Sequence, residues 1–290
     1  MWILLGLSCA LLTSLGDTLS KKLLAGSDER VVAWGQLLFT LPWAAAVMLH
    51  HGWPRVSPGF WITVAVMLPL EVTATLCYLR AIRICPLSLC VPFLAIIPLL
   101  TVLTGWLFLG ERVSWAGFLG VASVTGGAYL LQVEHAARGI LEPFREMFRV
   151  PGIRLVLTTA ACYGVTATLG KKAIQLSGPT EFPFLYYALN MLAVGEIARR
   201  SVSARGMLSA VRSRRGLFTL AGLVSAGSLL TFSFGIRRVP VAYFISVKRL
   251  SLLATVLTGG FLFGEEAFGR RAMGTALMLS GAILITLSGR

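Results

Sequence analysis

The sequence predicts an all-α membrane protein of ten transmembrane helices, arranged as two inverted-topology five-helix repeats around a central cavity. Of its 290 residues, 56% are hydrophobic and only 13% are charged, which is far more apolar than a soluble domain of this size. Apolar segments long enough to cross a hydrocarbon core of ~30 Å recur along the chain with short polar breaks between them. A twelve-residue pattern also occurs twice at a fixed spacing, which indicates an internal repeat.

Ten apolar stretches predict the ten spans in order. In the first half they cover residues 2–24, 31–49, 59–83, 86–109 and 114–132. In the second half they cover residues 153–174, 181–198, 216–236, 240–263 and 269–288. The stretch 133–152 carries too many charges to cross the bilayer, so we expect an interfacial linker between a first repeat at 1–132 and a second at 153–290.

The repeat is clearest in two segments, LTVLTGWLFLGE at 100–111 and ATVLTGGFLFGE at 254–265, which are identical at seven of twelve positions. The match extends along most of each half, through Lys21 and Lys171, Pro86 and Pro240, and Gly120 and Gly274. Because each unit holds an odd number of spans, the second copy must enter the bilayer from the opposite side. Inverted pairs suit alternating access, so this organisation predicts a secondary transporter.

Each half also holds a helix that begins with Pro and ends in Gly-Glu, followed by a Gly-rich helix. These positions are Pro86, Gly110, Glu111, Gly120 and Gly127, and then Pro240, Gly264, Glu265, Gly274 and Gly281. In this pattern the chain resembles the drug/metabolite transporter superfamily, EamA type, over essentially its full length. The resemblance implies ten helices around a central cavity, lined in part by the third, fourth, eighth and ninth helices. It leaves the substrate open.

Two features of this pattern have simple structural explanations. Glu111 and Glu265 each follow a glycine and precede a new helix, so we interpret them as carboxylates favoured by the dipole at a helix start. The Gly-rich closing helices are typical of close helix packing in membranes.

Charged residues at membrane depth point to a binding site, because each costs on the order of 3 kcal/mol at a helix centre. Glu71 lies midway along the third span, and Lys248 and Arg249 lie near the middle of the ninth. The repeat places uncharged Leu94 and Ala95 at the positions of the two cations. We predict that Lys248 or Arg249 attracts an anionic group of a substrate and that Glu71 is its counter-ion or a proton acceptor. The alternative is a fixed ion pair that orders the helices.

Other polar residues lie near these charges in the sequence. Tyr243, Ser251 and Thr255 on the ninth span, and Asp17 on the first, are further candidates for substrate binding, although Ser and Thr can also bond their own helix backbone. Asp17 is four residues before Lys21, a spacing suited to an ion pair. Four pseudo-symmetric lysines are candidates for gating substrate access, or alternatively for snorkelling to headgroups. They are Lys21, Lys22, Lys171 and Lys172.

Several function classes are disfavoured. The net charge is +14, but the basic residues gather at segment ends, where they meet lipid headgroups, so we expect no nucleic-acid partner. The five cysteines show no CxxC pairing, and HExxH, GxSxG and phosphate-loop motifs are absent from the sequence, so we expect no enzymatic activity, no metal and no cofactor. The expected partners are a small-molecule substrate and the lipid bilayer, with the chain a monomer or a homodimer.

The orientation in the membrane has two conflicting indications. Most basic residues, including the arginines between 199 and 215, fall on the side where the first span ends, and the positive-inside rule then places both termini outside. The resemblance implies both termini in the cytosol.

The N-terminus lacks a basic region before its apolar stretch, so we expect no cleaved signal peptide. We expect a multi-pass protein of a prokaryotic inner membrane.

The sequence therefore predicts a secondary active transporter of a small polar metabolite, anionic or zwitterionic, coupled to protons or to exchange. Two alternatives remain. A flippase for lipid headgroups would use the same fold with a lateral opening, and a membrane scaffold that transports nothing would seal its ion pair without a cavity.

Overall fold

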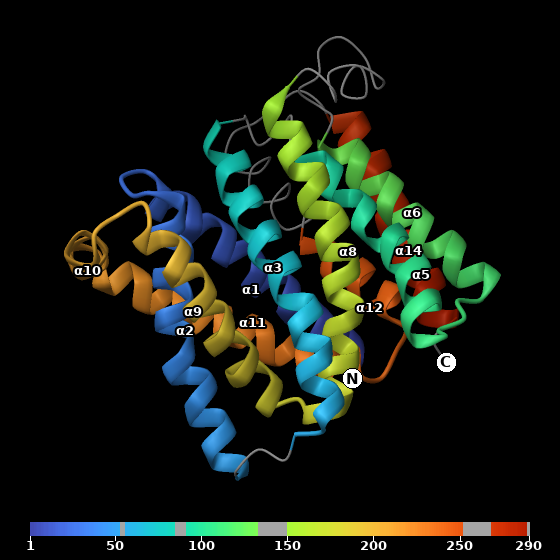
Figure 1. Ribbon diagram of the computed structural model, residues 1–290. Helices are drawn as coiled ribbons and strands as arrows, with labels where there is room; N and C mark the ends of the chain where they lie inside the picture. The colour runs from blue at the N-terminus through green and yellow to red at the C-terminus, as the bar shows by residue number, and fades with distance from the viewer. Residues whose placement is uncertain (53–55, 85–90, 133–149, 252–267, 289–290) are drawn as a thin grey trace.

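The structure is a computed structural model that describes residues 1–52, 56–84, 91–132, 150–251 and 268–288; these residues contain helices and no strand (Figure 1). The first half contains α1 (Trp2–Leu24), α2 (Glu29–His51), α3 (Pro58–Ile84), the 3-10 helix η1 (Val91–Ile96), α5 (Ile97–Leu109) and α6 (Trp115–Gln132). The second half contains α8 (Pro151–Ser177), α9 (Glu181–Arg199), α10 (Ala204–Ser213), α11 (Arg215–Ile236), α12 (Val241–Lys248) and α14 (Phe268–Ser288). The predicted all-α class is confirmed.

Within the described residues, the five helices α1, α2, α3, α8 and α11 are each long and apolar enough to cross a membrane. They coincide with five of the predicted spans. Two shorter apolar segments, Phe93–Leu109 and Met273–Ser288, fall in the predicted fourth and tenth spans. Residues 85–90 and 252–267, and the linker residues 133–149, lie outside the described residues, so the count of ten spans and the position of the linker stay predictions.

Helix α10 was not predicted, because its stretch of the sequence reads as a polar connection rich in arginine. The hydroxyl of Ser203 accepts a hydrogen bond from the backbone N–H of Gly206 at 3.2 Å and so caps the helix start. Met207 and Val211, four residues apart, form its narrow buried side. Arg205, Ser209 and Arg212 are exposed, and so is the apolar side chain of Leu208, a mixture typical of an interfacial helix.

Helices from the two halves pack against each other in five main pairs: α1 against α11, α3 against α8, α2 against α9, α2 against α11, and α6 against α14. In Figure 1, α5, α6 and α14 lie on one side of the bundle and α2, α9 and α10 on the other, with α1, α3 and α8 between them. The centre of the bundle is therefore shared by both halves.

The contact between α6 and α14 depends on glycine. A Cβ atom on Gly127 would lie 2.6 Å from the carbonyl oxygen of Gly274, and a Cβ on Gly120 would lie 2.8 Å from that of Gly281. Neither position could hold a side chain without separating the helices. The interpretation of these glycines as sites of close helix packing is confirmed.

Two ends of the bundle can be distinguished by their contacts. The guanidinium of Arg214 donates to the backbone oxygen of Lys22 at 3.0 Å, and Arg83 at the end of α3 pairs with Glu29 at the start of α2. We call this end, which also bears α10, the α10 face. Helix α1 runs from there back to Met1, which contacts Arg238 in the α11–α12 connection. We call that opposite end the terminal face.

Candidate functional site

A cavity of about 370 Å³ lies at the centre of the bundle, within the size range of small-molecule sites. Its wall includes residues of α1, α2, α3, α5 and η1 from the first half and of α8, α9, α11 and α12 from the second. Segments of the predicted third, fourth, eighth and ninth spans are thus among those that line it. Because both halves build its wall, neither half could form this cavity by itself.

Among the described residues, four charged side chains line this cavity, with one sign of charge from each half. Asp17 on α1 and Glu71 on α3 come from the first half, and Lys248 and Arg249 come from the second. Asp17 interacts electrostatically with both cations, and Glu71 interacts with Lys248. The ammonium of Lys248 also lies 5.8 Å from the ring centroid of Phe232, in reach of a cation–π interaction. The cavity is therefore polarised between the two halves.

The two cations are positioned by the end of a short helix. Helix α12 has eight residues and ends at Lys248, whereas the sequence predicted a continuous helix over 240–263. The backbone N–H of Arg249 still bonds the carbonyl oxygen of Ile245 at 3.1 Å, so both cations lie at the negative end of the α12 dipole, which favours them. Interrupted helices of this kind often end at transporter binding sites.

The matching position in the first half is also irregular. Residues 91–96 form the 3-10 helix η1, and the α-helical hydrogen bonding of α5 begins only at Ile97, with Pro98 in its first turn. Proline cannot donate a backbone hydrogen bond, which explains the irregularity there. Residues 245–250 lack proline, and the break after Lys248 has no such local cause.

Aromatic side chains form much of the remaining wall. Four of the six tyrosines in the chain line the cavity, namely Tyr78, Tyr163, Tyr186 and Tyr187. Phe182 and Tyr186 stack with their ring centroids 5.0 Å apart. Sequence reasoning did not single out these residues. One signal was present, because tyrosine in membrane spans gathers at the interfaces, whereas Tyr163 lies near the middle of the apolar segment 153–174.

Not all predicted binding residues reach the cavity. Ser251 lines it together with the four charges. Tyr243 does not: its hydroxyl lies 3.4 Å from that of Ser114, and its ring occupies the space beside Gly117 of α6. Tyr243 is five residues before Lys248, which turns it to the opposite side of α12. Thr255 lies outside the described residues. A role of any of these residues in binding substrate stays a prediction.

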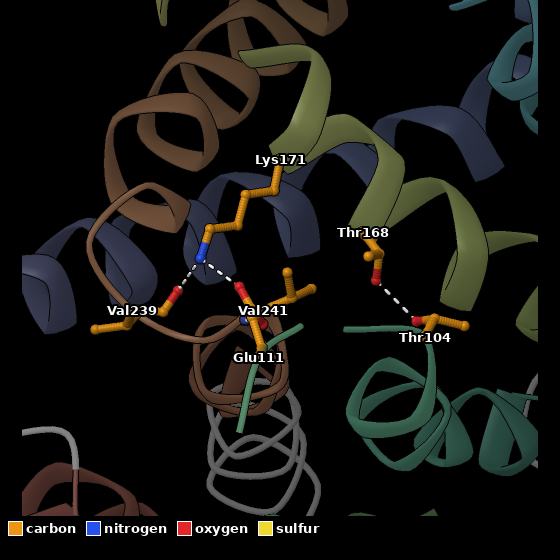
Figure 2. A network of polar contacts seen from close by, with 6 residues as sticks. All are labelled: Thr104, Glu111, Thr168, Lys171, Val239 and Val241. Carbon is orange, nitrogen blue, oxygen red and sulfur yellow. Dashed lines mark hydrogen bonds and ion pairs between the residues drawn. The ribbon is translucent and has the colours of Figure 1, made fainter. Parts of the chain in front are cut away.

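The four candidate gating lysines differ in their surroundings. Lys21 and Lys22 are exposed at the α10 face, and Lys172 is exposed on α8. Lys171 is buried, so snorkelling to headgroups is wrong for this residue. Its ammonium lies 2.5 Å from Oε1 of Glu111 and donates to the carbonyl oxygen of Val239 at 2.6 Å (Figure 2).

Glu111 also differs from expectation. Helix α6, which follows it, begins at Trp115 and is capped instead by Ser114, whose hydroxyl accepts the N–H of Gly117 at 3.1 Å. Glu111 reaches across to the other half, where its Oε2 accepts the N–H of Val241, the first residue of α12, at 2.8 Å. It is a helix-start carboxylate for a helix of the other repeat, which no local pattern could reveal.

Residues 1–133 and 150–287 match the model of the EamA-like transporter family. The chain belongs to this family. Among its relatives, a protein named "Riboflavin transporter" from Rhizobium johnstonii (strain DSM 114642 / LMG 32736 / 3841) is 26% identical over 98% of this chain and 89% of its own. A solved crystal structure of a protein, 18% identical, superposes with a TM-score of 0.72 over 99% of this chain and 96% of its own. That likeness supports the fold alone.

As an EamA-family member, the chain is an integral, multi-pass membrane protein, in agreement with its apolar helices. The family and the name of the relative point to a transporter rather than an enzyme. For this EamA-family protein, the central cavity is the natural candidate for the transport site.

Proposed function

We propose that this protein is a secondary active transporter that carries a small polar metabolite, anionic or zwitterionic, by alternating access through the central cavity. The observation that carries this proposal is a cavity built by both halves, with two carboxylates from one half opposite two cations from the other. A scaffold would gain little from such a site, because removing charges from water is a costly way to obtain stability.

The repeat supports exchange between two inverted units. Under the repeat spacing, cavity-lining positions of one half correspond to cavity-lining positions of the other: Thr13 to Tyr163, Asp17 to Ala167, Glu71 to Ser225 and Leu94 to Lys248. The helix pairs correspond too, because exchanging the halves converts α1 against α11 into α8 against α3. A cavity on the pseudo-symmetry axis can open alternately to either side. The position equivalent to each charged residue in the other repeat is uncharged, as expected for groups that the site requires only once.

Each charged side chain of the cavity has a role in the proposed transport cycle. Lys248 and Arg249 attract the anionic group of the substrate, and Glu71 and Asp17 hold a cationic group or a proton. A carboxylate that takes up a proton loses its attraction to Lys248, which would couple substrate release to protonation. Transport would then be driven by a proton gradient or proceed by exchange.

The tyrosine wall supports a substrate with a flat conjugated ring. Aromatic side chains stack on such rings, and the tyrosine hydroxyls can bond polar substituents. Riboflavin combines a flat ring system with a polar chain, and it is the molecule in the name of the relative. It is uncharged at neutral pH, so it tests the aromatic wall, whereas charged aromatic metabolites test the wall together with the charges. We therefore propose riboflavin and charged aromatic metabolites as the first substrates to test.

The test is uptake into proteoliposomes, with and without a pH gradient, for riboflavin and a panel of small anionic and zwitterionic metabolites. The variants are Glu71→Gln and Lys248→Met. The control variants are Glu196→Gln, at an exposed residue paired with Arg199, and Arg212→Met on the polar side of α10. Wild type and controls should transport, and both cavity variants should lose nearly all flux.

Two results would contradict the proposal. If folded wild type transports nothing while Lys248→Met unfolds at a lower temperature, the charges have a structural role and the protein is a scaffold. If wild type moves labelled phospholipids between leaflets but no soluble compound, the flippase alternative is correct.

A further inference from the structure

Three segments from both halves meet at the terminal face. They are the α5–α6 connection of the first half, the C-terminal part of α8, and the α11–α12 connection. Lys171 lies 2.5 Å from Glu111 and 2.6 Å from the carbonyl oxygen of Val239, while Glu111 accepts the N–H of Val241 (Figure 2). The side chains of Lys171 and Glu111 are only 8% and 14% exposed. Buried charges are tolerated when hydrogen bonds surround them, as here.

The same contact continues along α5 and α8. The hydroxyls of Thr104 and Thr168 lie 2.7 Å apart (Figure 2). Thr104 also donates to the carbonyl oxygen of Gly164 at 2.9 Å. Gly164, Thr168 and Lys171 are spaced four and three residues apart, so they share one side of α8. We call this continuous contact, from Gly164 and Thr104 to Lys171 and Glu111, the α5–α8 seam.

The seam borders the central cavity. Ala167 and Gly170 of α8 line the cavity, and Lys171 follows directly in the chain. A Cβ on Gly170 would lie 3.4 Å from the terminal methyl of Met67, another residue of the wall. The ion pair therefore lies at the boundary between the cavity and the terminal face.

The repeat reveals an asymmetry between the two ends. Lys21 is the counterpart of Lys171 in the other half, yet it is exposed at the α10 face, while Lys171 is buried in its ion pair. Equivalent lysines are thus in two different environments at once. Such a difference between equivalent positions is expected of an alternating-access carrier, in which the two ends close at different stages of the cycle.

We propose that Glu111 and Lys171 are positioning residues of the transport cycle, whose ion pair closes the cavity toward the terminal face and breaks when that face opens. This inference rests on the proposed function. The gate then consists of Lys171 from the second repeat and Glu111 from the first. The proposal also explains why Glu111 bonds the start of α12, because closing the gate holds the helix whose other end carries Lys248.

The first test measures closure without any substrate. A reporter cysteine is introduced by Met67→Cys in a background where the five native cysteines are replaced by alanine. A membrane-impermeant thiol reagent is added only to the compartment that the terminal face meets. Removing the ion pair by Glu111→Gln should speed labelling roughly ten- to hundredfold, the factor that corresponds to losing one charge-assisted hydrogen bond. Lys171→Gln should do the same if Glu111→Gln fails to fold.

The matched control is Glu196→Gln, which removes an exposed carboxylate that pairs with Arg199 and Arg200. It should leave labelling of the reporter unchanged. If Glu111→Gln and Lys171→Gln fold but label at the rate of the unaltered pair, the seam does not close the cavity and the proposal is wrong.

The second test separates a gate from a static brace. The hydroxyls of Thr104 and Thr168 are close enough for Thr104→Cys with Thr168→Cys to form a disulfide after a small shift, with Glu111 and Lys171 left intact. Oxidation should stop transport, and reduction should restore it, while each single cysteine variant should be insensitive to oxidant. Undiminished transport by the oxidised protein would show that the seam never opens. If wild type transports no compound, the proposed function fails, yet the labelling result still decides whether the pair closes the cavity.

Discussion

The central cavity places charged side chains among apolar helices, and the electrostatic energy of each side chain depends on its partners. Asp17 interacts with Lys248 and Arg249, and Glu71 interacts with Lys248. The two acids and two bases make the wall formally neutral. A substrate with both signs of charge can then bind by replacing these internal attractions, which is why we favour a zwitterion or an anion accompanied by a proton.

Replacing Asp17 by asparagine tests this electrostatic balance. The cavity gains one net positive charge, so Asp17→Asn should lower the KM for anionic substrates and raise it for zwitterionic ones. Uptake kinetics with one substrate of each kind measure the change, and Glu196→Gln serves as the control for loss of a carboxylate. Equal effects on both substrates would contradict the polarised site.

Buried hydroxyls in this protein differ in how they are bonded. Thr168 bonds Thr104 at 2.7 Å, whereas the hydroxyl of Ser233 is buried without a partner among the described residues. Thr168→Val should therefore lower the free energy of unfolding by about 0.5 to 1 kcal/mol, and Ser233→Ala should leave it unchanged or raise it. Thermal unfolding in detergent compares the two. A larger loss of unfolding free energy for Ser233→Ala than for Thr168→Val would mean that the Ser233 hydroxyl has a hydrogen-bond partner.

At the scale of helices, the same repeat position can serve different purposes. The α6–α14 pair uses glycines from both halves for direct backbone contact, and it stands beside the cavity-bearing group of helices rather than within it. The ends of α5 and α12, in contrast, differ between the halves: α5 is preceded by a 3-10 turn, and α12 ends at Lys248. Both of these irregular positions border the cavity, which Leu94 and Lys248 line.

Two neighbouring glycines of α6 allow a matched test of this packing. A Cβ on Gly127 would lie 2.6 Å from a backbone oxygen, but one on Gly126 would meet only a Leu277 methyl at 3.6 Å. Gly127→Ala should cost about 1 to 3 kcal/mol of stability, and Gly126→Ala should be neutral or stabilising by up to about 1 kcal/mol. Thermal unfolding of the two variants measures this difference, and similar melting temperatures would contradict close contact at Gly127.

At the scale of the whole molecule, the α10 face collects basic residues from distant parts of the chain. Arg214 bonds the end of α1, Arg83 pairs across to α2, and α10 adds its own arginines. The positive-inside rule then places the α10 face in the cytosol and both termini outside. The terminal face, with the Glu111–Lys171 pair, would be external, so the structure would be closed to the outside.

Fusions at the C-terminus test this orientation. Alkaline phosphatase, which is active only outside the cytosol, should be active, and a fluorescent protein that matures in the cytosol should be dark. The opposite pair of results would show that the orientation implied by the family resemblance overrides the charge distribution, and it would make the closed terminal face cytosolic.

The sequence by itself was sufficient for the all-α class, the position of the main apolar helices, the family, and the glycines of the α6–α14 contact. These features depend on composition, local periodicity and a repeated motif, all of which are properties of neighbouring residues. Glu71, Lys248 and Arg249 could be singled out for the same reason, since a charge in an apolar span is conspicuous wherever the chain folds.

Only the tertiary structure decided which of these residues meet. It brought Asp17 and the tyrosines to the cavity, turned Tyr243 away from it, ended α12 at Lys248 and joined Glu111 to Lys171. These outcomes depend on the rotation of each helix and on contacts between residues 60 or more apart, as for Lys171 with Glu111. Local propensity carries no information about such contacts, because they arise when the two halves pack together and each buried charge must find its partner across the interface.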